Sequence, residues 1–201
     1  MLPITQNYAD LPLPTPEALA HSARLAEHIR TAIGAAGGLI PFSRYMELAL
    51  YAPGLGYYSA GARKFGAAGD FITAPELSPL FSRCLARQCA EVLGGMTGGS
   101  ILELGAGSGV MAADMLLELQ ALGALPEEYL ILEVSAELKE RQHATLAAKA
   151  PALVSKVRWL EMLPERFTGV IVGNEVLDAL PVERFRRAAV GYEEYCVRCE
   201  G

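Results

Sequence analysis

A short apolar run, a glycine-rich turn and a helical pattern follow one another directly in the middle of the chain. Ile101, Leu102 and Leu104 predict a buried strand. A helical stripe of apolar residues begins near Val110, and Gly123 ends it. Glycine occupies alternate positions of the turn between them, namely Gly105, Gly107 and Gly109. Strand, glycine turn and helix in this order predict the opening of a nucleotide-type βαβ unit.

Further strands and helices alternate after this unit. Residues 129–134, 157–160 and 169–173 are short apolar runs that predict three more strands. Ser135 is placed to cap a helix between the first two of these strands. Residues 163–167 have room for only a turn or two of helix. This alternation predicts an α/β fold, and the run at 169–173 is apolar enough to be buried on both faces of a parallel sheet.

The first hundred residues carry helical patterns that turns separate. Residues 17–36 predict a helix, and residues 41–50 predict a second one with Ser43 as its cap. A third helix is predicted from Pro75 to Leu93, after a short strand. The first helix should bury a stripe made of Leu19, Leu25, Ile29 and Ile33.

These patterns divide the chain into three parts. Residues 1–16 are rich in proline and predict an extended lead-in. Residues 17–99 form an N-terminal helical and loop segment, which ends in four closely spaced glycines. Residues 100–201 carry the α/β pattern and end in a hairpin predicted around Gly191.

Composition and charge narrow the class of protein. The chain has 201 residues, of which 52% are hydrophobic and 20% charged, so it can bury a substantial core. A formal net charge of −6 argues against a general nucleic-acid-binding protein. No apolar run reaches the roughly 18 residues of a membrane span, and the N-terminus lacks the pattern of a signal peptide. We therefore expect a cytoplasmic protein with neither nucleic acid nor membrane as a partner.

The four cysteines offer a weak alternative chemistry. Cys196 and Cys199 have the spacing of a zinc or redox pair. The two that would complete a zinc site, Cys84 and Cys89, lie far upstream in a helical segment. Reduced thiols are the simpler interpretation, and we predict no metal site.

The spacing of the glycines indicates which ligand the turn would bind. Dinucleotide turns usually read Gly-x-Gly-x-x-Gly, and here Val110 stands where the last glycine would be. Glu103 completes a Glu-x-Gly-x-Gly-x-Gly pattern, which resembles the first motif of S-adenosylmethionine (SAM) methyltransferases. SAM has a zwitterionic amino-acid end and a cationic sulfur, so a nearby acid is electrostatically favourable. The alternative for this motif alone is an ordinary tight turn between strand and helix.

Acidic and polar residues also end the later strands. Glu133 lies near the end of the run at 129–134, where an acid can accept hydrogen bonds from both ribose hydroxyls. Asn174, Glu175 and Asp178 follow the run at 169–173. Ligands of open α/β sheets bind beyond the carboxyl ends of strands, so these three residues fall where a substrate should lie. Without that context, Glu133 would be a solvated carboxylate and the other three would be capping and turn residues.

Five stretches taken together resemble the MidA-type SAM-dependent methyltransferases. This family includes the mitochondrial complex I assembly factor that methylates arginine on a complex I subunit. The resemblance spans roughly residues 40–198, and the second and fifth stretches are more specific than the glycine turn. The stretches are Gly56–Tyr58, Gly69–Glu76, Glu103–Gly109, Glu133–Ser135 and Asn174–Pro181.

The resemblance implies a Rossmann-like methyltransferase sheet of seven strands, with the N-terminal helices over the cofactor side. It also implies that the stretch from Asp70 to Glu76, including Thr73, contributes to the cofactor or substrate cleft. Family members are usually near twice this length, so we expect a truncated, N-terminal portion with four sheet strands and a hairpin. Such a portion would leave a sheet edge and an apolar face for a partner, such as a second copy in a homodimer, to cover.

The most specific hypothesis is methyl transfer from SAM to arginine on a protein substrate, with a complex I subunit as the candidate that the resemblance suggests. A protonated guanidinium needs a carboxylate to hold it and to accept its proton, and we assign this task to Glu175 and Asp178. Asn174 could position a substrate N–H group. Two alternatives stay open: a non-catalytic SAM- or protein-binding assembly module, and an NAD-dependent oxidoreductase. The residues predicted to hold SAM are Glu103, Gly105, Gly107, Gly109, Glu133, Asp70 and Thr73.

Overall fold

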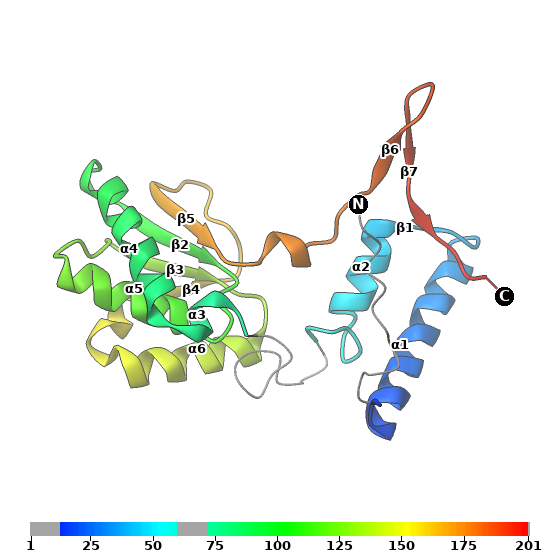
Figure 1. Ribbon diagram of the computed structural model, residues 1–201, viewed down its shortest axis with the longest axis horizontal. Helices are drawn as coiled ribbons and strands as arrows, with labels where there is room; N and C mark the ends of the chain where they lie inside the picture. The colour runs from blue at the N-terminus through cyan, green and yellow to red at the C-terminus, as the bar shows by residue number, and fades with distance from the viewer. Residues whose placement is uncertain (1–12, 60–71, 201) are drawn as a thin grey trace. The chain divides into compact units, whose positions relative to one another are not determined.

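The computed structural model describes residues 13–59 and 72–200 (Figure 1). The chain forms two compact units. One unit contains the described residues up to 59 together with those from 181 onward, and the other contains 72–180. The sequence-based division placed its boundary at residue 99, whereas the structure groups residues 79–94 with the sheet because they pack against the helix that follows the glycine turn.

The larger unit is built on a parallel sheet of four strands in the order β4-β3-β2-β5. β2 pairs with β3 on one side and with β5 on the other, so the direction of sheet growth reverses beside β2. The carboxyl ends of β2 and β5 flank this switch point, where open α/β sheets bind ligands. The predicted α/β class is confirmed, and the strands are β2 (Ser100–Leu104), β3 (Tyr129–Leu132), β4 (Val157–Leu160) and β5 (Gly169–Gly173).

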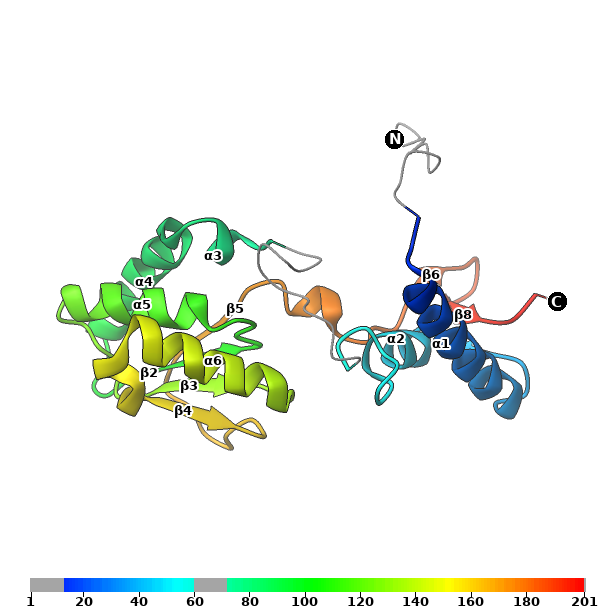
Figure 2. The same cartoon turned by 90° about the horizontal axis from the view of Figure 1, so that it is seen from below.

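Three helices pack on one face of this sheet (Figures 1 and 2). They are α4 (Pro79–Gly94), α5 (Val110–Ala121) and α6 (Ala136–Lys149). α5 contacts both α4 and α6, which explains why it is buried on nearly all sides. The core beneath the helices takes alternate residues from the strands, because side chains of a strand alternate between the two faces. These strand residues include Ile101, Tyr129, Ile131, Val157 and Val172.

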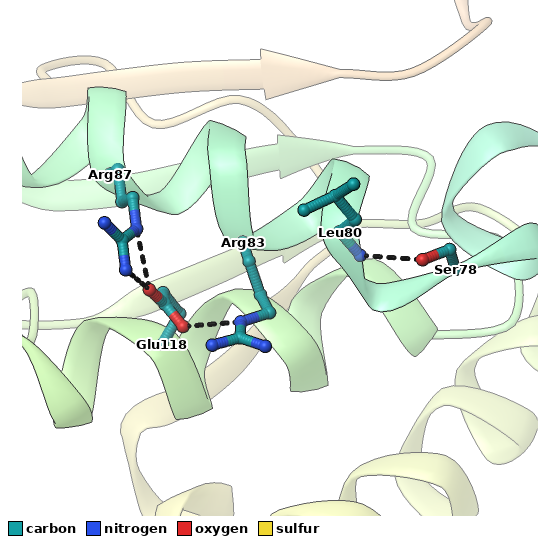
Figure 3. Close-up of polar contacts among 5 residues, drawn as sticks. All are labelled: Ser78, Leu80, Arg83, Arg87 and Glu118. Carbon is teal, nitrogen blue, oxygen red and sulfur yellow. Dashed lines mark hydrogen bonds and ion pairs between the residues drawn. The ribbon is translucent and has the colours of Figure 1, made fainter.

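Two arginines of α4 hold a buried carboxylate of α5. Arg83 Nε donates to Glu118 Oε2 over 2.7 Å, and Arg87 Nε donates to Glu118 Oε1 over 2.9 Å (Figure 3). These hydrogen bonds, that of Arg83 foremost, hold the pKa of Glu118 below its ordinary value although burial acts to raise it. A buried carboxylate without partners is costly, so the pair of arginines fixes α4 against α5.

The helix predicted from Pro75 to Leu93 is interrupted, which corrects the prediction. Ser78 is extended, with a φ of −163°, and separates α3 (Ala74–Leu77) from α4. Its Oγ accepts a hydrogen bond from Leu80 N over 3.1 Å (Figure 3). A capping serine followed by proline at the first helical position is a strong start signal, and it overrides the continuous apolar pattern.

One further prediction about the sheet unit is wrong. β5 is not buried on both faces, since Val172 is buried whereas Ile171 is 57% exposed. It is also the last strand of the sheet among the described residues. Residues 163–167 form no helix. Two short 3-10 helices lie elsewhere in this unit, namely η2 (Pro151–Lys156) and η3 (Leu177–Ala179).

The smaller unit combines segments from both parts of the chain. β1 pairs antiparallel with β8, a contact between distant short segments that the sequence did not predict. The hairpin around Gly191 is confirmed, and its strands pair antiparallel. Elements of this unit are α1 (Pro16–Ala35), β1 (Ile40–Pro41), α2 (Phe42–Tyr51), β6 (Phe185–Arg187), β7 (Tyr192–Glu194) and β8 (Cys196–Val197).

Packing in the smaller unit corrects two details. Ile33, Ile40 and Leu48 form its buried centre, whereas Leu19 of the predicted stripe is 56% exposed. Ser43 does not cap α2; its Oγ donates to a Glu183 carboxylate oxygen over 2.6 Å. In both described ranges, no helix has the length and apolar character that crossing a membrane requires.

Candidate functional site

The glycine turn joins β2 to α5 through three residues with left-handed backbone. The φ angles of Gly105, Gly107 and Gly109 are 61°, 55° and 80°, a region where other residues are strained by about 1–2 kcal/mol. A Cβ on Gly109 would lie 2.9 Å from Gln142 Cα, so the packing of α6 on the turn requires glycine there. A Cβ on Gly107 would meet no atom within 4 Å. Gly107 therefore faces open space that a ligand can approach closely.

The segment before α4 contacts the glycine turn through the carboxylate of Glu76. Ser108 Oγ donates a hydrogen bond to Glu76 Oε1 of α3, and Val110 N donates to Ser108 Oγ over 3.4 Å. Thr73 lies at the position that precedes α3. Asp70 lies outside the described residues. The structure thus brings the end of the stretch around residues 69–76 to the glycine turn.

Glu133 follows β3 and lies almost entirely within the protein, at 5% exposure. Its Oε1 accepts from Ser135 N over 3.0 Å, and its Oε2 accepts from Gln142 Nε2 over 3.0 Å. A carboxylate offers about four lone-pair sites, so both oxygens can still accept a further hydrogen bond. The two donors therefore fix the orientation of this carboxylate.

Glu103 lies in the core under α5. Its exposure is 1%, because the alternation of β2 places it on the same face as Ile101, toward the helices. Tyr129 Oη donates to Glu103 Oε2 over 2.7 Å. Burial raises the pKa of Glu103 to about 7, and the charge of Glu133 adds to the rise while the Tyr129 hydrogen bond opposes it. Glu103 is therefore a buried acid of the core, with the Tyr129 hydroxyl as its hydrogen-bond donor.

The segment after β5 lies beside the turn. Val176 Cγ2 is 3.3 Å from the position of a Cβ on Gly105 and 3.4 Å from that of a Cβ on Gly173. Glu175 has a φ of 53° and is the one non-glycine residue in the described ranges with a positive φ. Backbone strain of this kind is typical of active sites and ligand clamps. Asn174 is half-buried, and the side chains of Glu175 and Asp178 are exposed.

Gln142, which no sequence pattern marks, connects three parts of this region through hydrogen bonds. Gln142 is fully buried on α6. Its Nε2 donates to Gly107 O over 3.2 Å and to Glu133, and its Oε1 accepts from Trp159 Nε1 over 2.8 Å. The local sequence around it is mostly polar, so no apolar pattern marks it as buried.

Metal chemistry receives no support from the residues that the structure describes. They contain no group of three or more His, Cys, Asp and Glu side chains that could hold a metal ion. Cys196 and Cys199 are exposed free thiols, as is Cys84, and Cys89 is a buried free thiol.

Known proteins that are similar to this chain identify its family. Residues 84–201 match the family model described as "Putative S-adenosyl-L-methionine-dependent methyltransferase". A crystal structure of a COG1565 superfamily member from Burkholderia thailandensis, bound to S-adenosyl-homocysteine, is 53% identical with a TM-score of 0.86. The match covers 95% of this chain and 50% of that chain.

Two curated relatives are more distant. The mitochondrial protein arginine methyltransferase NDUFAF7 of Danio rerio is 30% identical, over 86% of this chain and 46% of its own length. The homologous mitochondrial protein of Caenorhabditis elegans is 31% identical, over 80% of this chain and 43% of its own length.

The chain thus spans about half the length of the relatives that it matches. The resemblance drawn from the five sequence stretches and the Rossmann-like fold class are confirmed. S-adenosyl-L-methionine is the cofactor of the family, and the similar crystal structure carries its demethylated product. The chain belongs to the family of S-adenosyl-L-methionine-dependent methyltransferases.

Proposed function

We propose that the protein transfers the methyl group of SAM to an arginine side chain of a protein substrate. The observation that carries this proposal is the glycine turn, where Gly107 faces open space. Glu133 is linked to the same turn through Gln142, and the segment after β5 packs against Gly105. The relatives named protein arginine methyltransferases support arginine as the acceptor.

The residues of this region fit the chemistry of SAM. Gly107 leaves space for the close approach of a ligand, while Gly105 and Gly109 supply the left-handed backbone of the turn. The partial positive charge at the N-terminus of α5 would favour the carboxylate of the amino-acid end. Glu133 would accept hydrogen bonds from the ribose hydroxyls. When bound, the cofactor supplies a methyl group on a cationic sulfur. The turn and Glu133 would hold it so that the acceptor nitrogen can attack in line.

The exposed carboxylates after β5 would receive the substrate. Arginine is protonated at neutral pH, so its guanidinium must be held by paired hydrogen bonds and must lose a proton during transfer. Glu175 and Asp178 would do both, and Asn174 would position a substrate N–H group. The strained backbone at Glu175 supports a functional role for this residue. A subunit of respiratory complex I is the candidate substrate that the MidA-type resemblance suggests.

The test is a methyl-transfer assay with tritiated SAM and a panel of peptides that contain either arginine or lysine. Arginine peptides should accept the label, and Glu175→Gln should suppress transfer while the Kd for SAM stays within about twofold. Glu165→Gln, a change at an exposed glutamate of the same unit, is the matched control and should leave transfer intact. Binding of SAM without transfer to any peptide would favour a non-catalytic module. Loss of SAM affinity in Glu175→Gln would assign that residue to the cofactor.

A further inference from the structure

The hydrogen bonds of Gln142 are those of a residue that orients its neighbours. Its side chain is fully buried, and a buried amide is costly unless its donors and acceptor are satisfied. Both donors and the acceptor of this amide have partners: Gly107 O, Glu133 Oε2 and Trp159 Nε1. The three partners come from the glycine turn, from the residue after β3 and from β4. The Gln142 side chain therefore forms hydrogen bonds to both the glycine turn and Glu133, which the proposed function assigns to cofactor binding.

The geometry leaves little freedom for these groups. The second oxygen of Glu133 is held by Ser135 N over 3.0 Å, so the Gln142 amide fixes the remaining rotation of the carboxylate. The close approach of α6 at Gly109, where a Cβ would lie 2.9 Å from Gln142 Cα, fixes the backbone that carries the amide. Trp159 Nε1 orients the amide because a glutamine in the opposite orientation would present a donor to this donor.

We propose that Gln142 is a positioning residue, which holds the Glu133 carboxylate and the Gly107 carbonyl in the arrangement that binds the nucleoside and amino-acid ends of SAM. The proposal rests on the proposed function, because it takes Glu133 and the glycine turn as cofactor-binding. Gln142 itself does not need to touch the cofactor. It acts through its two hydrogen bonds to groups that do.

The experiment is a double-mutant cycle in the affinity of the chain for S-adenosyl-homocysteine, measured by titration calorimetry. Gln142→Met retains the length of the side chain and removes all three hydrogen bonds, and we expect it to weaken binding about tenfold. Glu133→Gln should weaken binding by a similar or larger factor. The double variant should lose clearly less affinity than the product of the two single losses, because both changes disrupt the same carboxylate. Gln120→Met, at an exposed glutamine of α5, is the matched control.

A measurement without ligand separates positioning from general destabilisation. Hydrogen exchange of the peptide that contains Gly105–Gly109 should become faster in Gln142→Met and stay unchanged in the Gln120 control. Urea unfolding shows whether each variant is folded under the conditions in which the affinities are compared. Gln142→Asn, which withdraws the amide by one methylene, replaces the methionine variant if that variant does not fold. The same outcomes apply to it.

The outcomes distinguish the two proposals. If the wild-type chain does not bind S-adenosyl-homocysteine, or if Glu133→Gln leaves binding unchanged, the cofactor assignment and the role of Gln142 are both overturned. If Glu133→Gln weakens binding and Gln142→Met does not, only the role of Gln142 fails. Losses that multiply in the double variant would also overturn it, because they would mean that the two residues act independently.

Discussion

Replacing Glu103 with glutamine should change the unfolding free energy of the sheet unit differently at pH 8 and at pH 5. Relative to wild type, the variant should be more stable at pH 8 than it is at pH 5. The Glu103 carboxylate is 1% exposed, and its contacts are to the Tyr129 hydroxyl and to the core around α5. Glutamine keeps an oxygen that can accept from Tyr129, and it cannot ionise. The substitution therefore removes the buried charge while it retains the shape and the hydrogen bond.

The magnitude follows from the pKa of the buried group. Burial raises the pKa of Glu103 from 4.5 to about 7 in the folded protein. Because the folded state prefers the protonated form, its stabilising contribution is complete below about pH 4.5 and is lost as the pH rises through 7. At about 1.36 kcal/mol for each pH unit, the loss in unfolding free energy approaches about 3 kcal/mol at pH 8. Glu103→Gln should not show this loss.

Urea unfolding at pH 5 and pH 8 provides the assay. Trp159 is the only tryptophan of the chain and lies in β4, so its fluorescence reports on the unit that contains Glu103. Other titrating groups are common to both proteins, and any constant cost of the new amide cancels in the comparison between the two pH values. Glu165→Gln controls for the change of a surface glutamate. A difference between wild type and Glu103→Gln that is equal at both pH values would refute the reasoning.

Three further predictions concern the turn and the α4–α5 contact. Gly109→Ala should lower the unfolding free energy more than Gly107→Ala, because both have positive φ but only the Cβ at position 109 meets backbone; urea unfolding of the two variants tests this. Gly107→Ala should instead lower the affinity for S-adenosyl-homocysteine, since its methyl group enters the open space, and calorimetry that finds unchanged affinity would contradict this placement of the ligand. The double variant Arg83→Ala/Arg87→Ala should melt at a lower temperature than either single variant, because it leaves the buried carboxylate of α5 without both partners; circular dichroism melts that show no difference would argue against the clamp.

The glycine turn could be predicted because its causes are local. Left-handed backbone at Gly105, Gly107 and Gly109 needs glycine whatever the rest of the fold does, and apolar runs of strand length predict the strands beside it. The break at Ser78 was also local, since serine before proline is a start signal for a helix, but the apolar pattern across it was given more weight. The sequence-based helix was too long for this reason.

Gln142 and the pairing of β1 with β8 could not be predicted in the same way. Gln142 is buried because α6 approaches the turn, and that approach depends on the packing of α5 and α6, which no local pattern of the helix encodes. β1 and β8 are two residues each and meet from opposite parts of the chain, so neither carries a period that could be recognised. Tertiary contacts decide both features.

The burial of Glu103 changes how the acid of the motif can act. The sequence pattern suggested an acid close to the turn and favourable to the zwitterionic and cationic groups of SAM. In the structure Glu103 lies in the core with Tyr129 as its hydrogen-bond donor, whereas Glu133 is held by Ser135 and Gln142. A charge in a medium of low dielectric constant acts over a longer distance than one in water, so direct contact is not required for attraction. Burial raises the pKa of Glu103 to about 7, so this charge appears as the pH rises through that range. Its contribution to holding a cation would therefore grow with pH over the same range in which the fold loses stability. In the proposed cofactor site, Glu133 would therefore act through hydrogen bonds, and Glu103 would act through its charge in the core.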